Sequence, residues 1–429
     1  MGVAKPAAVS EHGKVRWLRW YICGLLFLAS TINYIDRQVL GILKPLLERE
    51  LGWTETQYGE IVMAFQAAYA AMMPIAGRLL DWLGIRAGYA LAVVVWSIAG
   101  MVTSLANTAM QFQIARFCLG LGEAANFPAS IKAVADWFPR RQRALATGIF
   151  NSGTNIGAVV APIIVPWITV HYGWREAFIF TGAIGFVWVA AWIWFYRQPE
   201  RHGRLAASEL AVIRSDSEQE PDEKIPYTRL LLTRQAWAFL LGKFLTDPVW
   251  WFYLGWLPGF LNRTYGVDLT QLGPPLIAVY LSADVGSVLG GWISSALLAR
   301  GVDVNRARKT AMFICASAVI AAMFVPQAGG NMWLAITLVS IAASAHQGWS
   351  ANLFTLTSDL FPKRAVGSVV GLGGMGGAVG GMLAAGAVGL WLDFSNRAYG
   401  PLFIMAGSMY LIALLVIHLL VPRMEPAKV

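Results

Sequence analysis

An acidic and a basic side chain stand next to each other inside an apolar stretch of this chain. Residues 33–37 read Asn-Tyr-Ile-Asp-Arg and lie within the apolar run 21–43. A charged side chain costs about 2.5–3.5 kcal/mol to insert at the centre of a membrane helix, so Asp36 and Arg37 need partners or a function. The aromatic cluster at residues 17–21 is typical of a membrane interface, and a span of about 20 residues from there puts the pair near the bilayer midplane. The alternative is a helix that begins earlier and leaves the pair solvated at its far rim.

A second acid and base lie seven residues apart in the fourth apolar stretch. Arg116 and Glu123 are separated by two helical turns, roughly 10 Å, so their side chains point the same way. They predict either a structural ion pair or a site that handles protons and anions. Arg116 has the further alternative of extending to the nearby interface. Two tyrosines inside apolar stretches, Tyr34 and Tyr69, are added as candidate substrate contacts.

Polar residues in three later stretches extend the candidate site. Asn151 and Asn155 share one helical face and suit either hydroxyl recognition or hydrogen bonding between helices. Lys243 precedes Asp247 by four residues, so the pair either binds a ligand or satisfies itself. The tenth stretch holds a polar run with one aromatic ring, which is typical of a sugar-recognition surface or, alternatively, of an interhelical network: His346, Gln347, Trp349, Ser350 and Asn352.

The loop after the second apolar stretch carries a recognisable spacing of glycine and charge. Gly77, Asp81, Gly84 and Arg86 resemble the G-x-x-x-D-x-x-G-x-R signature of the major facilitator superfamily, in the loop where that family carries it. A charge pair between Asp81 and Arg86 is expected to latch one conformation. The alternative is a turn with solvated charges. The corresponding loop of the second half, residues 291–301, carries serine at the acidic position.

The composition decides the class of protein that must position these side chains. Of the 429 residues, 57% are hydrophobic and 13% are charged, against about 25% charged in soluble proteins. Lipid favours helices, because each backbone group must be bonded within its own segment. We predict an all-α integral membrane protein with twelve transmembrane helices, at about residues 17–43, 56–80, 86–106, 110–134, 142–170, 175–196, 236–262, 271–298, 307–326, 331–357, 364–391 and 401–421.

The net charge of +9 reports topology and not a nucleic-acid partner. With the N-terminus inside, most of the 33 Lys and Arg residues fall in the even-numbered loops and the termini, which is the positive-inside bias. Both termini are therefore predicted to be cytoplasmic. Cys23, Cys118 and Cys315 lie in apolar stretches and are interpreted as buried small residues, so neither a disulfide nor a metal site is expected. No removable signal peptide is recognised.

The chain divides into two halves that read as a diverged repeat. A charged, proline-punctuated segment, residues 197–235, is predicted to link an N-terminal bundle (1–196) to a C-terminal bundle (236–429), with a short amphipathic helix at 206–213. Asp-Trp-Phe-Pro-Arg at 136–140 matches Asp-Leu-Phe-Pro-Lys at 359–363. Repeats of this kind place the substrate at the midplane between the halves. The same offset maps Glu123 onto His346, which predicts one central cavity.

The narrower resemblance is to the anion:cation symporter family and its bacterial hexuronate transporters. It rests on residues 33–37, on Arg116 with the Glu-Ala-Ala-Asn-Phe-Pro run at 123–128, and on the Trp-Phe-Pro motif that begins at 137. The resemblance implies proton-coupled uptake of a sugar acid across the bacterial inner membrane. It also implies that Asp36 and Glu123 carry protons and that Arg37 binds the substrate carboxylate.

Other functions are weighed against that expectation. Galactonate or glucarate is the alternative substrate, and a proton-driven exporter of apolar drugs is the alternative transporter. An enzyme would need a metal or nucleophile cluster, which five scattered His and three apolar Cys do not supply. The glycine run at 371–377 lacks the preceding strand and following lysine of a nucleotide loop. We expect no cofactor, and a monomer whose partners are the sugar acid, protons and the lipid bilayer.

Overall fold

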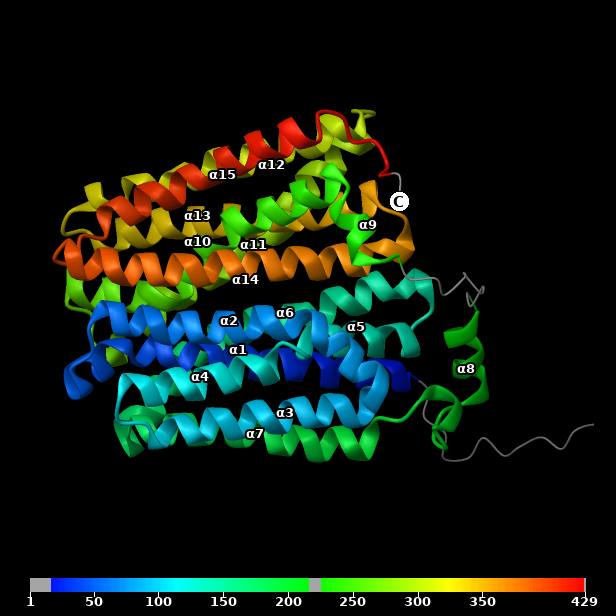
Figure 1. The fold of residues 1–429 in the computed structure, drawn as a ribbon, viewed down its shortest axis with the longest axis horizontal. Coiled ribbons are helices and arrows are strands. Elements are labelled where there is room, and N and C mark those ends of the chain that lie inside the picture. Colours follow the sequence, from blue (N-terminus) through cyan, green and yellow to red (C-terminus); the bar gives the residue numbers. More distant parts are fainter. Residues whose placement is uncertain (1–16, 216–224, 428–429) are drawn as a thin grey trace, which may run out of the picture.

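The computed structural model describes residues 17–215 and 225–427, and every regular element in these ranges is helical. Figure 1 shows the long helices running side by side in two bundles, with the N-terminal half of the chain in one and the C-terminal half in the other. The N-terminal bundle contains α1 (Leu18–Leu51), α2 (Glu55–Leu83), α3 (Ile85–Val102), α4 (Ala109–Glu123), α5 (Asn126–Trp137), α6 (Arg140–Tyr172) and α7 (Trp174–Phe195).

The C-terminal bundle and the linker follow the same pattern of long helices joined by short connections. The bundle contains α10 (Arg234–Tyr265), α11 (Gly273–Ala299), α12 (Val304–Val319) continued by the 3₁₀ segment η4 (Ile320–Ala328), α13 (Met332–Leu360), α14 (Lys363–Phe394) and α15 (Gly400–Leu420). The linker holds two short helices, α8 (Ala207–Arg214) and α9 (Tyr227–Leu231). Because α4 and α5 continue one another, the described residues form six rods in each half, as predicted.

Most of these rods are long and apolar enough to cross a membrane. Nine helices in the described ranges meet both conditions. The long helices α10 and α13 do not reach that level of apolarity, and they hold the predicted Lys243 and His346. α4 and α5, with 15 and 12 residues, are each too short to cross alone, and α4 holds Arg116. Polar residues inside membrane segments mark functional sites, so this reduced apolarity points to the same centre as the sequence does.

Two predicted spans differ from the helices that form. The fourth span was predicted as one helix over 110–134, but it breaks between Glu123 and Asn126 into α4 and α5. Pro128 explains the break, because proline has no N–H to donate and its ring crowds the carbonyl four residues earlier. The first span was expected to end near Pro45, yet α1 continues through this proline to Leu51.

The linker is fastened to the start of α1. Glu209 of α8 is buried and accepts hydrogen bonds from the backbone N–H groups of Leu18 (3.0 Å) and Arg19 (3.3 Å). Its carboxylate also pairs with the Arg19 guanidinium at 3.1 Å. The first N–H groups of a helix have no partner within the helix, so Glu209 caps α1 from a distant part of the chain. The predicted helix at 206–213 therefore forms and packs against the N-terminal bundle.

The two bundles meet along three helix pairs. α2 packs on α14, α1 on α10, and α6 on α11. The closest approach uses glycine: a Cβ at Gly41 would lie 2.6 Å from the Leu254 carbonyl, and one at Gly59 would lie 2.6 Å from that of Ala385. Both glycines lie toward the end where α1 ends and α2 begins, which we call the closed end.

Polar contacts also join the halves at the closed end. The Tyr58 hydroxyl donates to the Gly255 carbonyl at 2.8 Å. The Asp393 carboxylate accepts from the first N–H groups of α2, at Glu55 (3.0 Å) and Thr56 (2.7 Å). Buried Lys44 adds ion pairs to Glu48 and Glu55 within the N-terminal half. Together with the glycine contacts, these hydrogen bonds close the gap between the bundles at this end and form a seal between them.

Candidate functional site

A cavity of about 220 Å³ lies between the two bundles, on the side of Arg37 away from the closed end. Both halves contribute to its wall. The N-terminal half supplies Ser30, Asn33, Tyr34, Arg37, Tyr69, Met73, Asn126, Phe127, Asn151, Thr154 and Asn155; the C-terminal half supplies Lys243, Asp247, Trp250, Trp251, Ser287, His346, Gln347, Ser350, Phe354, Val370, Gly374 and Ala378. The prediction of one central cavity lined from both sides agrees with this placement.

Arg37 is the cation at the centre of this cavity, and it has a fixed partner. Its Nε donates to Oε2 of Glu123 at 2.5 Å, and the exposed fractions of the two side chains are 8% and 0%. The guanidinium lies within 4.8–5.5 Å of four aromatic ring centres, those of Tyr34, Phe65, Tyr69 and Trp251. Cation–π contacts and the ion pair hold the planar group in one orientation. Its two terminal nitrogens remain for a ligand.

Glu123 lies behind Arg37 and does not line the cavity. The alternative of a solvated pair at a helix rim is excluded by the burial of Asp36 and Arg37. Of the two alternatives left open for Arg116 and Glu123, the direct ion pair does not form, because Arg37 of α1 takes the Glu123 carboxylate. Arg116 is buried as well, and its Nη1 donates to the backbone carbonyl of Asp36 at 3.3 Å.

The Asp36 carboxylate is buried beside these groups without a hydrogen-bond partner among the described residues. The Thr181 side chain of α7 and the charged Glu123 and Arg116 side chains lie close enough to interact with it. A buried carboxylate without a bonded cation is unstable in its ionised form in low-dielectric surroundings. This arrangement of two acids and two arginines can therefore bind an anion or exchange a proton.

In the cavity wall supplied by the C-terminal half, the two oppositely charged side chains neutralise each other. Lys243 and Asp247 pair with each other at 2.9 Å, which is the alternative that their spacing left open. His346 stacks on Trp250 with ring centres 5.2 Å apart and planes within 5°. Its Nδ1 shares a hydrogen bond of 2.5 Å with the Tyr410 hydroxyl. His346 and Glu123, which the sequence repeat was predicted to relate, are both buried.

Two predicted contacts from the tenth stretch are not on the cavity wall. Trp349 is fully buried and packs edge-on against Tyr410. Asn352 donates to the carbonyls of Gly290 (2.8 Å) and Gly348 (2.9 Å), where α11 and α13 are in close contact. Both side chains belong to the interhelical network that was the alternative for this run. Gln347 and Ser350 do line the cavity.

The remaining predicted residues of the N-terminal half lie as expected or find other partners. Tyr34, Tyr69, Asn151 and Asn155 line the cavity, and Arg116 lies beneath it. Trp250, Trp251 and Ser287 also line the cavity and were not predicted. The two tryptophans follow Asp247 by three and four residues, so their place on the same helical face was the available signal.

The signature loop between α2 and α3 forms a charge contact with a different partner from the one expected. Asp81 pairs with Lys132 of α5, and the Lys132 ammonium also donates to the Gly77 carbonyl at 2.8 Å. Arg86, the expected partner, donates instead to the backbone carbonyl of Ile193 in α7. Gly84 has φ +74° at the junction of the two helices, a left-handed value that favours glycine. The loop thus ties α2 to α5 within the N-terminal bundle.

Comparisons with known proteins agree with this geometry. The family model described as Major Facilitator Superfamily matches residues 26–385. A hexuronate transporter of Escherichia coli (strain K12) is 35% identical over 411 residues, which cover 94% of each chain. A galacturonate transporter of Dickeya chrysanthemi is 34% identical over 65% of this chain and 82% of that one. The solved structure of the E. coli xylose transporter XylE, in an inward open conformation, shares the fold with a TM-score of 0.72, at 15% identity over 94% of this chain and 96% of that one.

Proposed function

This chain belongs to the major facilitator superfamily, a family of transporters and not of enzymes, and from that premise we propose that it is a proton-coupled symporter that imports a hexuronate. The observation that carries the proposal is Arg37, a buried guanidinium on the wall of a central cavity with one nitrogen held by Glu123. The relatives with the names hexuronate and galacturonate transporter support the choice of substrate class.

The substrate carboxylate binds the two terminal nitrogens of Arg37. A guanidinium presents parallel N–H donors that match the two oxygens of a carboxylate. The asparagines of α6 and the Gln347 amide offer donors and acceptors to hydroxyl groups along the rest of the cavity. The aromatic rings around Arg37 pack against C–H faces of the sugar. One acid group at one end and several hydroxyls at the other is the pattern of a sugar acid.

The charge balance of the cavity favours a substrate with one carboxylate over one with two. Arg37 already faces Glu123, and Lys243 already faces Asp247. A second carboxylate would therefore meet a neutral pair, and burying an unpaired charge costs several kcal/mol. Glucuronate or galacturonate is preferred on this ground over glucarate. The same charged wall disfavours an apolar drug.

Competition for Arg37 couples the substrate to protons. When the substrate carboxylate binds the Arg37 guanidinium, Glu123 shares that positive charge with the substrate. A buried carboxylate with only part of a counter-charge is stabilised by taking up a proton. Asp36 is a second proton site, or it orients Arg37 through the shared helix. The proton thus enters with the substrate and leaves when the substrate does.

We place the closed end at the periplasm and the cavity mouth at the cytoplasm of the bacterial inner membrane, with both chain ends cytoplasmic. This orientation follows the distribution of Lys and Arg. The conformation described is then an inward-facing one. Its existence supports alternating access, in which the bundles rock about a fixed central site.

A flux assay tests the proposal. Purified protein in proteoliposomes should accumulate labelled glucuronate when the outside is more acidic than the inside, and should only equilibrate it without a pH gradient. Unlabelled galacturonate should compete, and glucarate should compete much less. Uptake that ignores the pH gradient contradicts coupling, and the absence of glucuronate uptake contradicts the substrate class.

A further inference from the structure

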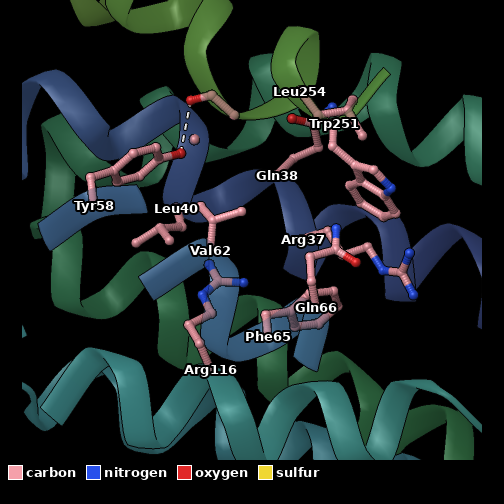
Figure 2. Close-up of a pocket in the computed structure, with 12 residues that line it drawn as sticks. Arg37, Gln38, Leu40, Tyr58, Val62, Phe65, Gln66, Arg116, Trp251 and Leu254 are labelled. Carbon is pink, nitrogen blue, oxygen red and sulfur yellow. Dashed lines mark hydrogen bonds between the residues drawn. The ribbon is translucent and has the colours of Figure 1, made fainter. Parts of the chain in front are cut away.

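A second chamber, of about 50 Å³, lies on the other side of Arg37, between that residue and the closed end. Figure 2 shows it enclosed by side chains of α1, α2, α4 and α10. Arg37 and Trp251 border both this chamber and the large cavity. The chamber therefore continues the central site toward the closed end, with Arg37 at the boundary between the two spaces.

Two glutamines in the chamber wall have unmet hydrogen bonds. The Gln38 and Gln66 residues are 1% and 0% exposed, and the side-chain oxygen and nitrogen of each have no partner among the described residues. The Tyr280 hydroxyl of α11 lies beside the Gln38 side chain, close enough to interact with it. Buried amides nearly always have partners. Two that share one chamber indicate that something polar binds between them.

Arg116 adds a cation to the same chamber. It lines the chamber with its guanidinium, as Figure 2 shows. Its Nη1 is used by the Asp36 carbonyl, whereas its Nε and Nη2 have no hydrogen-bond partner among the described residues. Val62 and Leu254 add apolar side chains to the wall. Amides that both donate and accept, beside a guanidinium and apolar walls, suit a polyhydroxylated acid.

The chamber is separated from the closed face only by the seal described above. Gly41 packs on the Leu254 carbonyl, and the Tyr58 hydroxyl is bonded to the Gly255 carbonyl. A substrate that reaches Arg37 from that face must pass this seal. The chamber wall is therefore the surface that a substrate meets first once the seal parts, and the amides on it would contact the sugar before the large cavity does.

We propose that this chamber is the outer half of the substrate site, in which Gln38 and Gln66 bind hydroxyl groups of a sugar acid whose carboxylate rests on Arg37. The proposal rests on the proposed function and extends it to a second set of residues. At 50 Å³ the chamber holds about three or four waters, so in the closed form water satisfies the amides. Opening of the seal enlarges the chamber, and the substrate replaces that water.

The test separates hydroxyl recognition from carboxylate binding. Initial rates of glucuronate uptake are measured in proteoliposomes for the parent protein, Gln38→Leu and Gln66→Leu. We expect each substitution to raise KM by about tenfold or more, where each tenfold corresponds to about 1.4 kcal/mol. Inhibition by hexanoate, a six-carbon acid without hydroxyls, should stay within about twofold of the parent value, because it uses Arg37 alone.

Gln113→Leu is the matched control, because its amide donates to Glu60 (2.9 Å) outside both spaces. Its KM should equal that of the parent. If a leucine variant is not monodisperse after purification, methionine at the same position gives the same comparison with a more adaptable side chain. A parent that does not take up glucuronate refutes the proposed function. If the parent takes up glucuronate and KM is unchanged in both glutamine variants, the chamber holds water only.

A parallel rise in the hexanoate inhibition constant would also overturn the proposal, because it would show displacement of Arg37.

Thiol labelling gives an independent readout that needs no transport. Gln38→Cys and Gln66→Cys are made after Cys23, Cys118 and Cys315 are replaced by serine. An impermeant thiol reagent added outside should label both, and glucuronate should protect both. Labelling that glucuronate leaves unchanged excludes a substrate at this wall.

Discussion

Arg37 combines three roles that no other side chain could fill together. Its Nε binds Glu123, its terminal nitrogens face the cavity, and its flat face packs against aromatic rings. Lysine carries the same charge as a single point on a flexible stem. It can satisfy Glu123 or a substrate carboxylate but not both in the planar arrangement.

We therefore expect Arg37→Lys to lose glucuronate binding by about 100-fold or more, since hydrogen bonds to charged groups contribute about 1.5–3 kcal/mol each. Thermal shift measures this, because a ligand that binds only the folded protein raises Tm with concentration. Arg86→Lys is the control, because Arg86, at the start of α3, donates to the Ile193 carbonyl of α7 and lines neither space, and its shift should match the parent. Near-parental stabilisation of Arg37→Lys would remove Arg37 from the binding site.

The sequence was sufficient to find the charged centre but not its pairing. Charge inside an apolar stretch selected Asp36, Arg37, Arg116 and Glu123, and all four are buried together. Spacing along one helix left an ion pair of Arg116 with Glu123 as one of two alternatives. The angle at which α1 crosses α4 is a tertiary feature that spacing does not contain. The buried glutamines of the second chamber were missed because an uncharged amide in an apolar stretch is unremarkable without its neighbours.

Helix contacts at the closed end depend on glycines that have no room for a side chain. Gly41→Ala would place a methyl group 2.6 Å from the Leu254 carbonyl, and such overpacking typically costs about 1–3 kcal/mol. The cost applies only while α1 and α10 touch, so the variant should favour the form in which the seal is open. External thiol labelling of Val62→Cys in the chamber should then be about tenfold faster or more.

Gly24→Ala is the matched control on the same helix, because a Cβ there meets nothing within 4 Å. It should leave the labelling rate of Val62→Cys at the parent value. Equal labelling in the two alanine variants would show that the α1–α10 contact does not limit opening.

The clamp between α8 and α1 gives a stability prediction at the same scale. Glu209→Ala removes the cap of the first turn and leaves the buried Arg19 guanidinium without its carboxylate, which typically costs about 3–5 kcal/mol. We expect a lower Tm with unchanged substrate affinity, because the described part of the linker contributes no residue to the cavity wall. Thermal unfolding in detergent with and without glucuronate measures both quantities.

Glu200→Ala serves as the comparison within the same linker. Glu200 pairs with Arg214 at the surface, where the exposed fractions of the two side chains are 51% and 44%, and such pairs contribute about 0–1 kcal/mol. A Tm as low as that of Glu209→Ala would mean that any change in the linker destabilises the protein. An unchanged Tm in Glu209→Ala would mean that the clamp does not support α1.

The number and order of the long helices could be predicted because apolar length is a local property. The exceptions depend on particular residues: Pro128 breaks the fourth rod, whereas Pro45 is accommodated inside α1. Local sequence does not distinguish these two prolines. The cap supplied by Glu209 lies about 190 residues away along the chain and has no short-range signal.

At the scale of the whole molecule, the two bundles share one central site and a seal at one end. The two halves differ in charge near this site: the N-terminal half holds two arginines and two acids that are buried together, and the C-terminal half holds the Lys243–Asp247 ion pair. Under the proposed function, the proton sites therefore belong to the N-terminal bundle, and the C-terminal bundle contributes contacts to the substrate.

This division predicts that substrate binding and proton coupling can be separated by one substitution, which replaces a carboxylate oxygen with an amide nitrogen. Glu123→Gln keeps an oxygen that can accept from the Nε of Arg37, so the variant should bind glucuronate and exchange it across a membrane with substrate on both sides. Accumulation driven by a pH gradient should be lost, because net cycling requires a group that releases its proton inside and an amide cannot ionise. Exchange and pH-driven uptake are measured on the same purified protein.

Asp36→Asn should behave like Glu123→Gln if Asp36 carries a second proton. It should lose substrate binding if the role of Asp36 is to orient Arg37.

Glu60→Gln is the control, since Glu60 binds Gln113 outside both spaces and should leave exchange and accumulation intact. A structural role for Glu123 predicts a different result from a coupling role. Without the carboxylate, Arg37 would be a buried cation lacking its counter-charge, which costs about 3–5 kcal/mol and would appear as poor folding. A well-folded Glu123→Gln protein that still accumulates glucuronate would exclude Glu123 as the coupling residue. A well-folded one that exchanges but does not accumulate would place the proton on Glu123, because the two assays share every step except the return of the empty carrier.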